Sequence, residues 1–176
     1  MQAFYRLLSA LLLCACTPEK SSFREVSADT YFPISIGDAN PELQLALTEM
    51  EQSWGLMHRD ELAENHGMLF LFKQPGKRSF WMRNTPIPLD LAYFDTRGVL
   101  MEIHSLYPYD ENSVYSYSGE VLIAVEMNRG WFSKNNIQPG AKLDLEALTE
   151  AVIHRGYPYL TRIINRRQYH ESPSQP

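Results

Sequence analysis

The sequence contains few cysteines and no excess of positive charge, and both shortages exclude classes of function. Cys14 and Cys16 are the only cysteines among the 176 residues, so the rest of the chain cannot form the disulfides that staple many small secreted domains. Sixteen Lys and Arg stand against twenty-one Asp and Glu, and the net charge is −5 at pH 7. Nucleic-acid-binding domains carry the opposite, basic charge. We therefore expect no nucleic acid among the partners.

The N-terminus also lacks a hydrophobic run long enough to cross a membrane. The apolar stretch from Leu7 to Ala15 is interrupted by Ser9 and falls far short of the ~20 residues that a spanning helix needs. Behind the single cation Arg6, this stretch is typical of the hydrophobic part of a secretory signal peptide. We expect residues 1–15 to be that signal.

The signal ends in Leu13-Cys14-Ala15-Cys16, which resembles the lipobox of bacterial lipoproteins, where a cysteine after a small residue is lipidated. The resemblance implies lipid attachment at Cys16. Two alternatives stay open: attachment at Cys14, and cleavage as an ordinary secreted protein. Several acyl chains on one cysteine hold a protein stably on a membrane without spanning it. Because Thr17 is not acidic, the lipoprotein pattern favours the outer membrane, with the protein facing the periplasm.

The remaining chain divides by composition into three parts. Residues 16–40 are rich in Ser, Asp, Pro and Gly, which is typical of a flexible tether. Residues 41–145 are predicted to form a β domain, because the chain's 44% hydrophobic and 12% aromatic residues suffice to bury a core. Residues 146–176 carry arginines among apolar residues at helical spacing. We expect two short helices packed on the domain with solvated arginines; the alternative is a basic amphipathic helix that binds a membrane or a partner.

Within residues 41–145, short apolar runs alternate with turns. Leu43, Leu45 and Leu47 repeat with the period of a strand. Thr48 and Glu51 form a capping-box pair, which predicts a short amphipathic helix directly afterwards. Six or seven short strands follow from this reading. The predicted fold is mainly β: a small β-sandwich or barrel with a few short helices and a helical C-terminal tail.

Five segments of this region, 54–59, 67–70, 80–90, 125–130 and 137–140, closely resemble the bacterial family called domain of unknown function 192. The resemblance extends over about residues 41–145. It implies a small β-sandwich or barrel. The family has no established activity, so the resemblance indicates the fold and leaves the function open.

Polar residues interrupt two of the predicted strands at places where a pocket would form. Asn84 and Asp90 flank a corner stiffened by two prolines. On the strand that starts at Val121, the polar Glu126 and Asn128 share a face with Ala124. We expect either a pocket lined by these residues or a structural hydrogen-bond network that pins the corner.

Aromatic residues supply the second part of the hypothetical binding site. If Met82 faces the core, strand alternation places Trp81 and Arg83 outside, and these two residue types are frequent in binding hot spots. The long loop 105–119 contributes Tyr107, Tyr109 and Tyr117, each with an apolar ring and a polar hydroxyl. The alternative for the tyrosines is that they pack the loop onto the domain.

These observations favour a non-enzymatic, membrane-anchored accessory domain of the cell envelope that binds a glycan or an envelope protein, with no cofactor. An alternative is a hydrolase of envelope saccharides, with Asp90 and Glu126 as its two carboxylates. A lesser alternative is copper binding through thioether and imidazole ligands. Its candidate ligands are Met57, His58, His66 and Met68.

Overall fold

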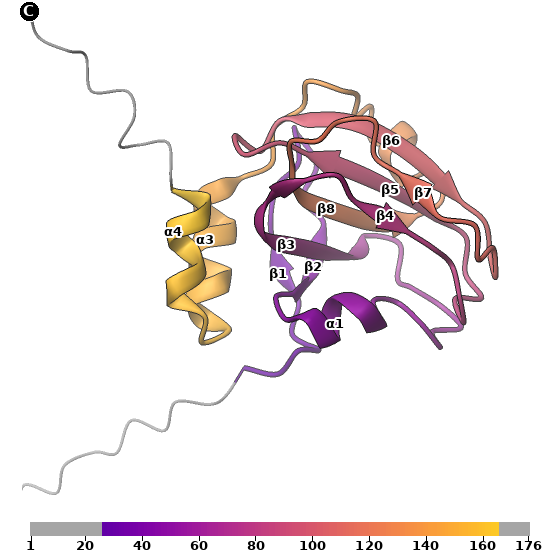
Figure 1. The fold of residues 1–176 in the computed structure, drawn as a ribbon, viewed down its shortest axis with the longest axis horizontal. Helices are drawn as coiled ribbons and strands as arrows, with labels where there is room; N and C mark the ends of the chain where they lie inside the picture. The colour runs from indigo at the N-terminus through magenta and orange to yellow at the C-terminus, as the bar shows by residue number, and fades with distance from the viewer. Residues whose placement is uncertain (1–25, 166–176) are drawn as a thin grey trace, which may run out of the picture.

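The fold of residues 26–165, as described in a computed structural model, is built on one six-stranded sheet (Figure 1). The strand order is β1-β2-β3-β8-β5-β6, and a second sheet pairs β4 with β7. All pairs are antiparallel except β2 and β3. The six strands are β1 (Phe32–Pro33), β2 (Glu42–Ala46), β3 (His66–Gly76), β5 (Leu89–Phe94), β6 (Leu100–Leu106) and β8 (Val121–Asn128). The chain is therefore mainly β, as predicted.

The parallel pair is connected by helix α1 (Glu49–Trp54). The predicted capping box is confirmed, because the Thr48 hydroxyl accepts the Glu51 N–H and the Glu51 carboxylate accepts the Thr48 N–H. The expected buried face of this helix is wrong: Met50 is 79% exposed and Trp54 is 59% exposed. The helix is too short to cover the sheet, so its apolar side chains border open pockets instead.

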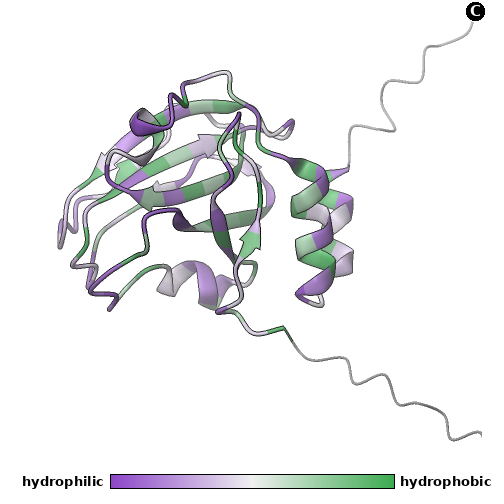
Figure 2. Ribbon diagram, turned by 180° about the vertical axis from the view of Figure 1, so that it is seen from behind, coloured by the Kyte–Doolittle hydropathy of each residue, from purple (hydrophilic) through white to green (hydrophobic). Residues whose placement is uncertain are grey.

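Each face of the sheet carries its own core because side chains alternate along the strands. The first core contains Leu43, Leu69 and Val125 and is covered by helices α3 (Leu145–His154) and α4 (Thr161–Ile164). The figures show these helices beside the sheet, and hydrophobic segments recur along the central strands and the helices (Figure 2).

The second core lies on the opposite face and contains Phe70, Leu91 and Ala124. It is covered by the corner that follows strand β4 (Ser79–Phe80) and contributes Met82 and Ile87. Strand β4 pairs with β7 (Val114–Tyr115). The Phe80 ring packs edge-on against Phe70, with centroids 4.9 Å apart. This face carries the candidate site.

The C-terminal tail packs on the domain as two short helices separated by a 3₁₀ turn (Pro158–Leu160). Leu148, Val152 and Leu160 join the first core. The solvation expected of its arginines is wrong for Arg155, which is only 7% exposed. It donates to the Leu45 carbonyl at 2.7 Å and to Glu51 Oε1 at 2.5 Å, and so fastens the tail to β2 and α1.

The tether expected over residues 16–40 needs correction in its second half. Ile34 and Ile36 are fully buried in the first core, and β1 pairs with β2. These residues therefore belong to the folded domain. The predicted signal, the lipid-attachment residue Cys16 and the arginines Arg166 and Arg167 lie outside the described residues. Across residues 26–165, no helix has both the length and the apolar character that crossing a membrane requires.

Candidate functional site

Glu126 is a carboxyl group buried on the second face of the sheet. It lies on β8 directly opposite Met68 of β3 and Leu91 of β5, and residues paired in this way point to the same face. Only 4% of the residue is exposed. Within residues 26–165 its carboxyl oxygens accept no hydrogen bond, and they are not fully enclosed: the fully buried side-chain atoms without a partner there are Arg78 Nε and Arg155 Nε. A buried charge without partners is strongly disfavoured.

Burial raises the pKa of Glu126 to about 8, against a smaller opposing effect of the positive charge on Arg59. The group is therefore mainly a neutral carboxylic acid at pH 7. In that form it can donate one hydrogen bond and accept others.

A narrow pocket of about 30 Å³ leads to this carboxyl group, which is space for about one or two water-sized groups. Gly55 forms one wall, with a positive φ of 51°. A Cβ atom at Gly55 would lie 3.6 Å from the Phe70 ring and 3.9 Å from Glu126 Oε2. The turn that ends α1 thus runs close over the carboxyl group. The other lining residues are Gln52, Ser53, Trp54, Leu56, Met57, Phe80, Trp81 and Thr85.

The narrow pocket opens into a wider groove of about 410 Å³ between α1 and the β4 segment. We call the two together the aromatic groove. Both parts share Gln52, Ser53, Phe70, Phe80 and Trp81. Trp81 is 44% exposed. An open groove with an aromatic lining and a few buried polar groups is typical of a ligand-binding site.

The alternation expected around Trp81 is confirmed, since Met82 is only 2% exposed. Arg83 is exposed, and its guanidinium carbon lies 5.6 Å from the centre of the Trp81 ring. Asn84 is also exposed and adopts a positive φ of 54°. Its carbonyl accepts the His58 N–H at 2.8 Å. Trp81 therefore lines the groove, whereas Asn84 fixes the corner behind it.

Asp90 does not join this site. It lies opposite Met127 and not opposite Glu126, so its side chain is on the first face of the sheet. Its carboxylate accepts the Gly130 N–H at 2.7 Å and the Ser105 hydroxyl at 3.0 Å, and Arg129 Nε lies at 3.5 Å. The pocket predicted to include both carboxyls is wrong in this respect. The two groups share no cleft, which removes the acid and base pair of the hydrolase alternative.

Asn128 shares the face of Glu126, as predicted, but its amide is used elsewhere. It donates to the carbonyls of Leu62 and Ala63 at 3.0 and 2.9 Å. These bonds hold the segment that leads into β3. The structural interpretation therefore describes Asn128 and Asp90 better than the pocket interpretation.

The loop tyrosines are exposed but do not line the aromatic groove. Tyr107 lies against the Arg129 guanidinium at 4.4 Å. The Tyr109 N–H donates to the Thr85 carbonyl, and the Tyr117 N–H donates to the Glu102 carboxylate. These contacts are at separate places, so the loop offers no continuous aromatic wall.

The imidazoles of the copper alternative have aromatic neighbours of their own. The His66 ring lies 4.0 Å from the Tyr31 ring, and the His58 ring lies 5.4 Å from the Trp54 ring, between centroids. Residues 26–165 contain no group of three or more His, Cys, Asp or Glu side chains placed to hold a metal ion. The geometry gives copper no further support.

Sequence reasoning missed most of the groove. Of the residues predicted for the aromatic and polar binding site, only Trp81 and Glu126 line the groove. A usable signal was present: the segments 54–59, 67–70 and 80–90 that carry the family resemblance all contribute lining residues. When three segments that carry a family resemblance are distant in the sequence but line one pocket, the pocket is a candidate site.

Comparisons with known proteins agree with the fold. The model of the family DUF192, described as "Uncharacterized ACR", matches residues 31–145. No match is found among curated proteins. A solved structure of a protein of unknown function from Novosphingobium aromaticivorans is 35% identical, with a TM-score of 0.61 over 64% of this chain and 84% of that one. A Sinorhizobium meliloti structure described as a putative transcription regulator is 28% identical, with a TM-score of 0.62 over 65% of this chain and 92% of that one.

Proposed function

Because the chain belongs to the DUF192 family, whose description assigns no activity, we propose from the site itself that this protein is a non-enzymatic, glycan-binding domain of the cell envelope. The aromatic groove receives a sugar ring, and the buried carboxyl group of Glu126 binds one of its hydroxyls. The observation that carries the proposal is the combination of exposed indoles with a buried, neutral, unpartnered carboxyl at the end of one groove.

The chemistry of the groove suits an uncharged polyhydroxylated ligand. Trp54 and Trp81 are 59% and 44% exposed, and each indole has a flat apolar face that can pack against the C–H side of a sugar ring. At the end of the groove, a neutral carboxylic acid can donate to one hydroxyl and accept from another. A hydrogen bond from the ligand would give the Glu126 carboxyl a partner that the protein does not supply. Because a buried polar group without a partner costs stability, such a bond favours binding.

Binding fits the groove better than hydrolysis does. Glycoside hydrolysis ordinarily needs two carboxyl groups that flank the scissile bond. Glu126 faces the groove, but Asp90 lies on the opposite side of the sheet with its own partners. The other acidic residue that lines the groove is Glu49, and its carboxylate is paired with Lys73 at 2.9 Å.

The test is calorimetric titration of the full-length chain with oligosaccharides of N-acetylglucosamine in a polyoxyethylene detergent, which contains neither sugar nor carboxylate. We expect binding that Trp81→Ala weakens by about tenfold, the size of one lost aromatic contact. Glu126→Gln retains a neutral donor and keeps most of the affinity at pH 7, whereas Glu126→Leu loses it. Tyr117→Ala removes an equally exposed ring outside the groove and serves as the matched control.

Two results would contradict this proposal. Equal affinity of the Trp81→Ala and Tyr117→Ala variants would place any sugar elsewhere. Release of shorter sugars during the titration, detected by chromatography, would show that the protein is an enzyme.

The membrane anchor is a separate part of the proposal and rests on the lipobox resemblance at Cys16. We expect Cys16→Ser to leave the membrane fraction and to take up no labelled fatty acid. Cys14→Ser is the matched control and should stay in the membrane. Retention of the Cys16→Ser chain with its label would refute the assignment.

A further inference from the structure

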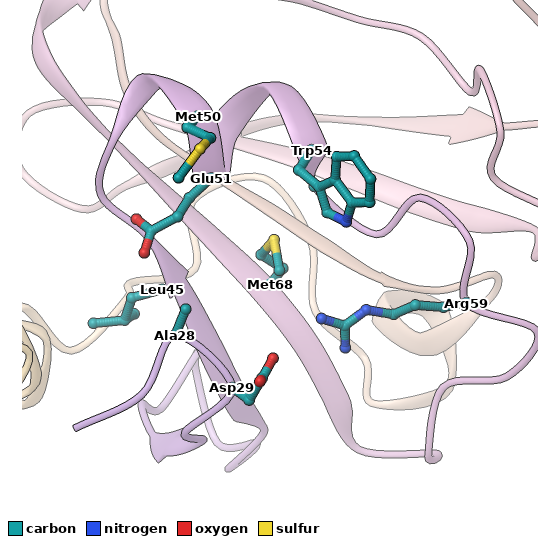
Figure 3. A pocket seen from close by; sticks show the side chains of 9 residues that line it. Ala28, Asp29, Leu45, Met50, Glu51, Trp54, Arg59 and Met68 are labelled. Atoms are coloured by element: carbon teal, nitrogen blue, oxygen red, sulfur yellow. The ribbon is translucent and has the colours of Figure 1, made fainter. Parts of the chain in front are cut away.

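A second pocket borders the turn that ends α1. It has a volume of about 270 Å³ and shares Trp54 and Gly55 with the narrow pocket at Glu126. Its walls come from the segment that precedes β1, from β2, from α1 and the segment after it, and from β3 (Figure 3). We call it the Arg59 pocket, because the Arg59 guanidinium points into it (Figure 3).

Arg59 is a fixed cation without an acidic partner among the described residues. Its Nη2 donates to Gln44 Oε1 at 2.6 Å, and its Nη1 lies 3.3 Å from the Tyr31 hydroxyl. No carboxylate of residues 26–165 lies within 4.0 Å of it. A guanidinium has five N–H donors, and these two bonds use two of them. The remaining donors are free for an anion, and they suit the two oxygens of a carboxylate.

Gln44 makes this arrangement rigid. It is only 2% exposed, and its Nε2 donates to the Asp29 carbonyl at 2.9 Å. One buried amide thus fixes both the cation and the segment opposite. A side chain held before the ligand arrives loses little freedom on binding.

The rest of the pocket is apolar except at its rim. Met50 and Trp54 border one side and Met68 the base, and the Asp29 carboxylate points inward from the rim (Figure 3). Within residues 26–165 the Asp29 carboxylate has no hydrogen-bond or ion-pair partner; the Gln44 amide bonds to the backbone carbonyl of Asp29. Glu51, which also borders the pocket, is already bonded to the Leu47 and Thr48 N–H groups and to Arg155.

We propose that the Arg59 pocket binds a small apolar α-amino acid. Arg59 takes the carboxylate, Asp29 takes the ammonium group, and the apolar side chain packs among Met50, Trp54 and Met68. One cation and one anion across an apolar pocket match a zwitterion, whereas a fatty acid would leave Asp29 facing an apolar chain. The amino acid and the glycan are assigned to different pockets, which share Trp54 and Gly55 in their walls.

The test is calorimetric titration of the full-length chain with L-leucine in the same polyoxyethylene detergent. We expect saturable binding. Leucinamide, which lacks the carboxylate, and 4-methylpentanoate, which lacks the ammonium group, should each bind at least tenfold more weakly. Arg59→Gln should abolish leucine binding, and Arg83→Gln, an exposed arginine outside the pocket, should leave it unchanged. Thermal unfolding of each variant shows that it is folded.

Asp29→Asn gives an independent test, because the exposed rim residue is not needed for folding. This variant should weaken binding of leucine at least fivefold and leave the affinity for 4-methylpentanoate unchanged. The proposal is overturned if L-leucine gives no saturable heat up to about 10 mM, a concentration that exceeds the millimolar dissociation constants of weak specific sites. It is equally overturned if leucinamide binds as tightly as leucine, or if Asp29→Asn binds leucine as the wild type does.

Discussion

Asp90 and Glu126 lie on neighbouring strands, β5 and β8, but face opposite sides of the sheet. Both are buried, at 6% and 4% exposure. Asp90 is surrounded by donors: the Gly130 N–H, the Ser105 hydroxyl and the Arg129 guanidinium. Glu126 has none within residues 26–165 and ends a pocket.

The difference separates a structural carboxyl from one that is available to a ligand. A buried group with all its bonds made holds elements together, and Asp90 joins the ends of β5, β6 and β8 in this way. A buried group with no bonds made costs stability. Such a cost is expected at functional sites, where local rules of stability are broken. Three experiments sharpen or break this comparison.

The largest expected effect is that of Glu126 on the pH dependence of the free energy of unfolding. The folded protein holds the pKa of Glu126 at about 8, above the ordinary value of 4.5, so it binds the proton more tightly than the unfolded chain does. The contribution of Glu126 to stability is then fully present below pH 4.5 and is lost as the pH rises towards 8. The slope approaches about 1.4 kcal/mol per pH unit, so about 3–4 kcal/mol is lost between pH 5 and pH 8.

Glu126→Gln cannot ionise and should remove this slope. Urea unfolding at pH 5 and at pH 8 measures it, with the exposed Glu120→Gln as the control. The charge of Arg59 acts on Glu126 as well, but it is constant over this range, and Tyr93 stays neutral because burial raises its own pKa. A wild-type slope that survives in the Glu126→Gln variant would show that the group is not the buried acid described here.

The second expected effect is a loss of stability at Asp90. Asp90→Ala leaves the Gly130 N–H and the Ser105 hydroxyl without their acceptor and Arg129 without its counter-charge. We expect about 2–3 kcal/mol of destabilisation at pH 7, the usual cost of stranding buried polar groups. Urea unfolding measures it, and Asp38→Ala, at an exposed site, should be nearly neutral. A loss of ligand binding by a fully stable Asp90→Ala variant would reverse the roles assigned to the two carboxyls.

The sequence predicts one side of this comparison and not the other. Alternation along a strand places Glu126 on the face of Ala124, and the structure confirms it. Where Asp90 points depends on the register between β5 and β8, which sets Leu91 opposite Glu126. Register arises from contacts between segments distant in the chain, and a shift of one residue turns every side chain over.

The same limit explains why most of the groove was missed. The capping box at Thr48 and Glu51 correctly predicted α1, because it is a local interaction. The parallel pairing of β2 with β3 is not local, and it decides that the end of α1 runs over Glu126. Trp54 therefore lines a pocket, although an amphipathic helix is expected to bury its apolar side chains.

The smallest effect on stability, and the most direct view of the groove, is expected at Trp81. Trp81 is 44% exposed, whereas Trp131 is 3% exposed and donates from Nε1 to Asn65 Oδ1 at 3.0 Å. Trp81→Phe should change the free energy of unfolding by less than about 0.5 kcal/mol, as surface substitutions usually do. It should also remove a fluorescence component that acrylamide quenches strongly. Trp131→Phe should remove a shielded component and cost about 1–3 kcal/mol, through its lost hydrogen bond and packing. If Trp81→Phe proved the more destabilising of the two, Trp81 would belong to the core that Met82 occupies, and the groove would lose the exposed ring on which ligand binding depends.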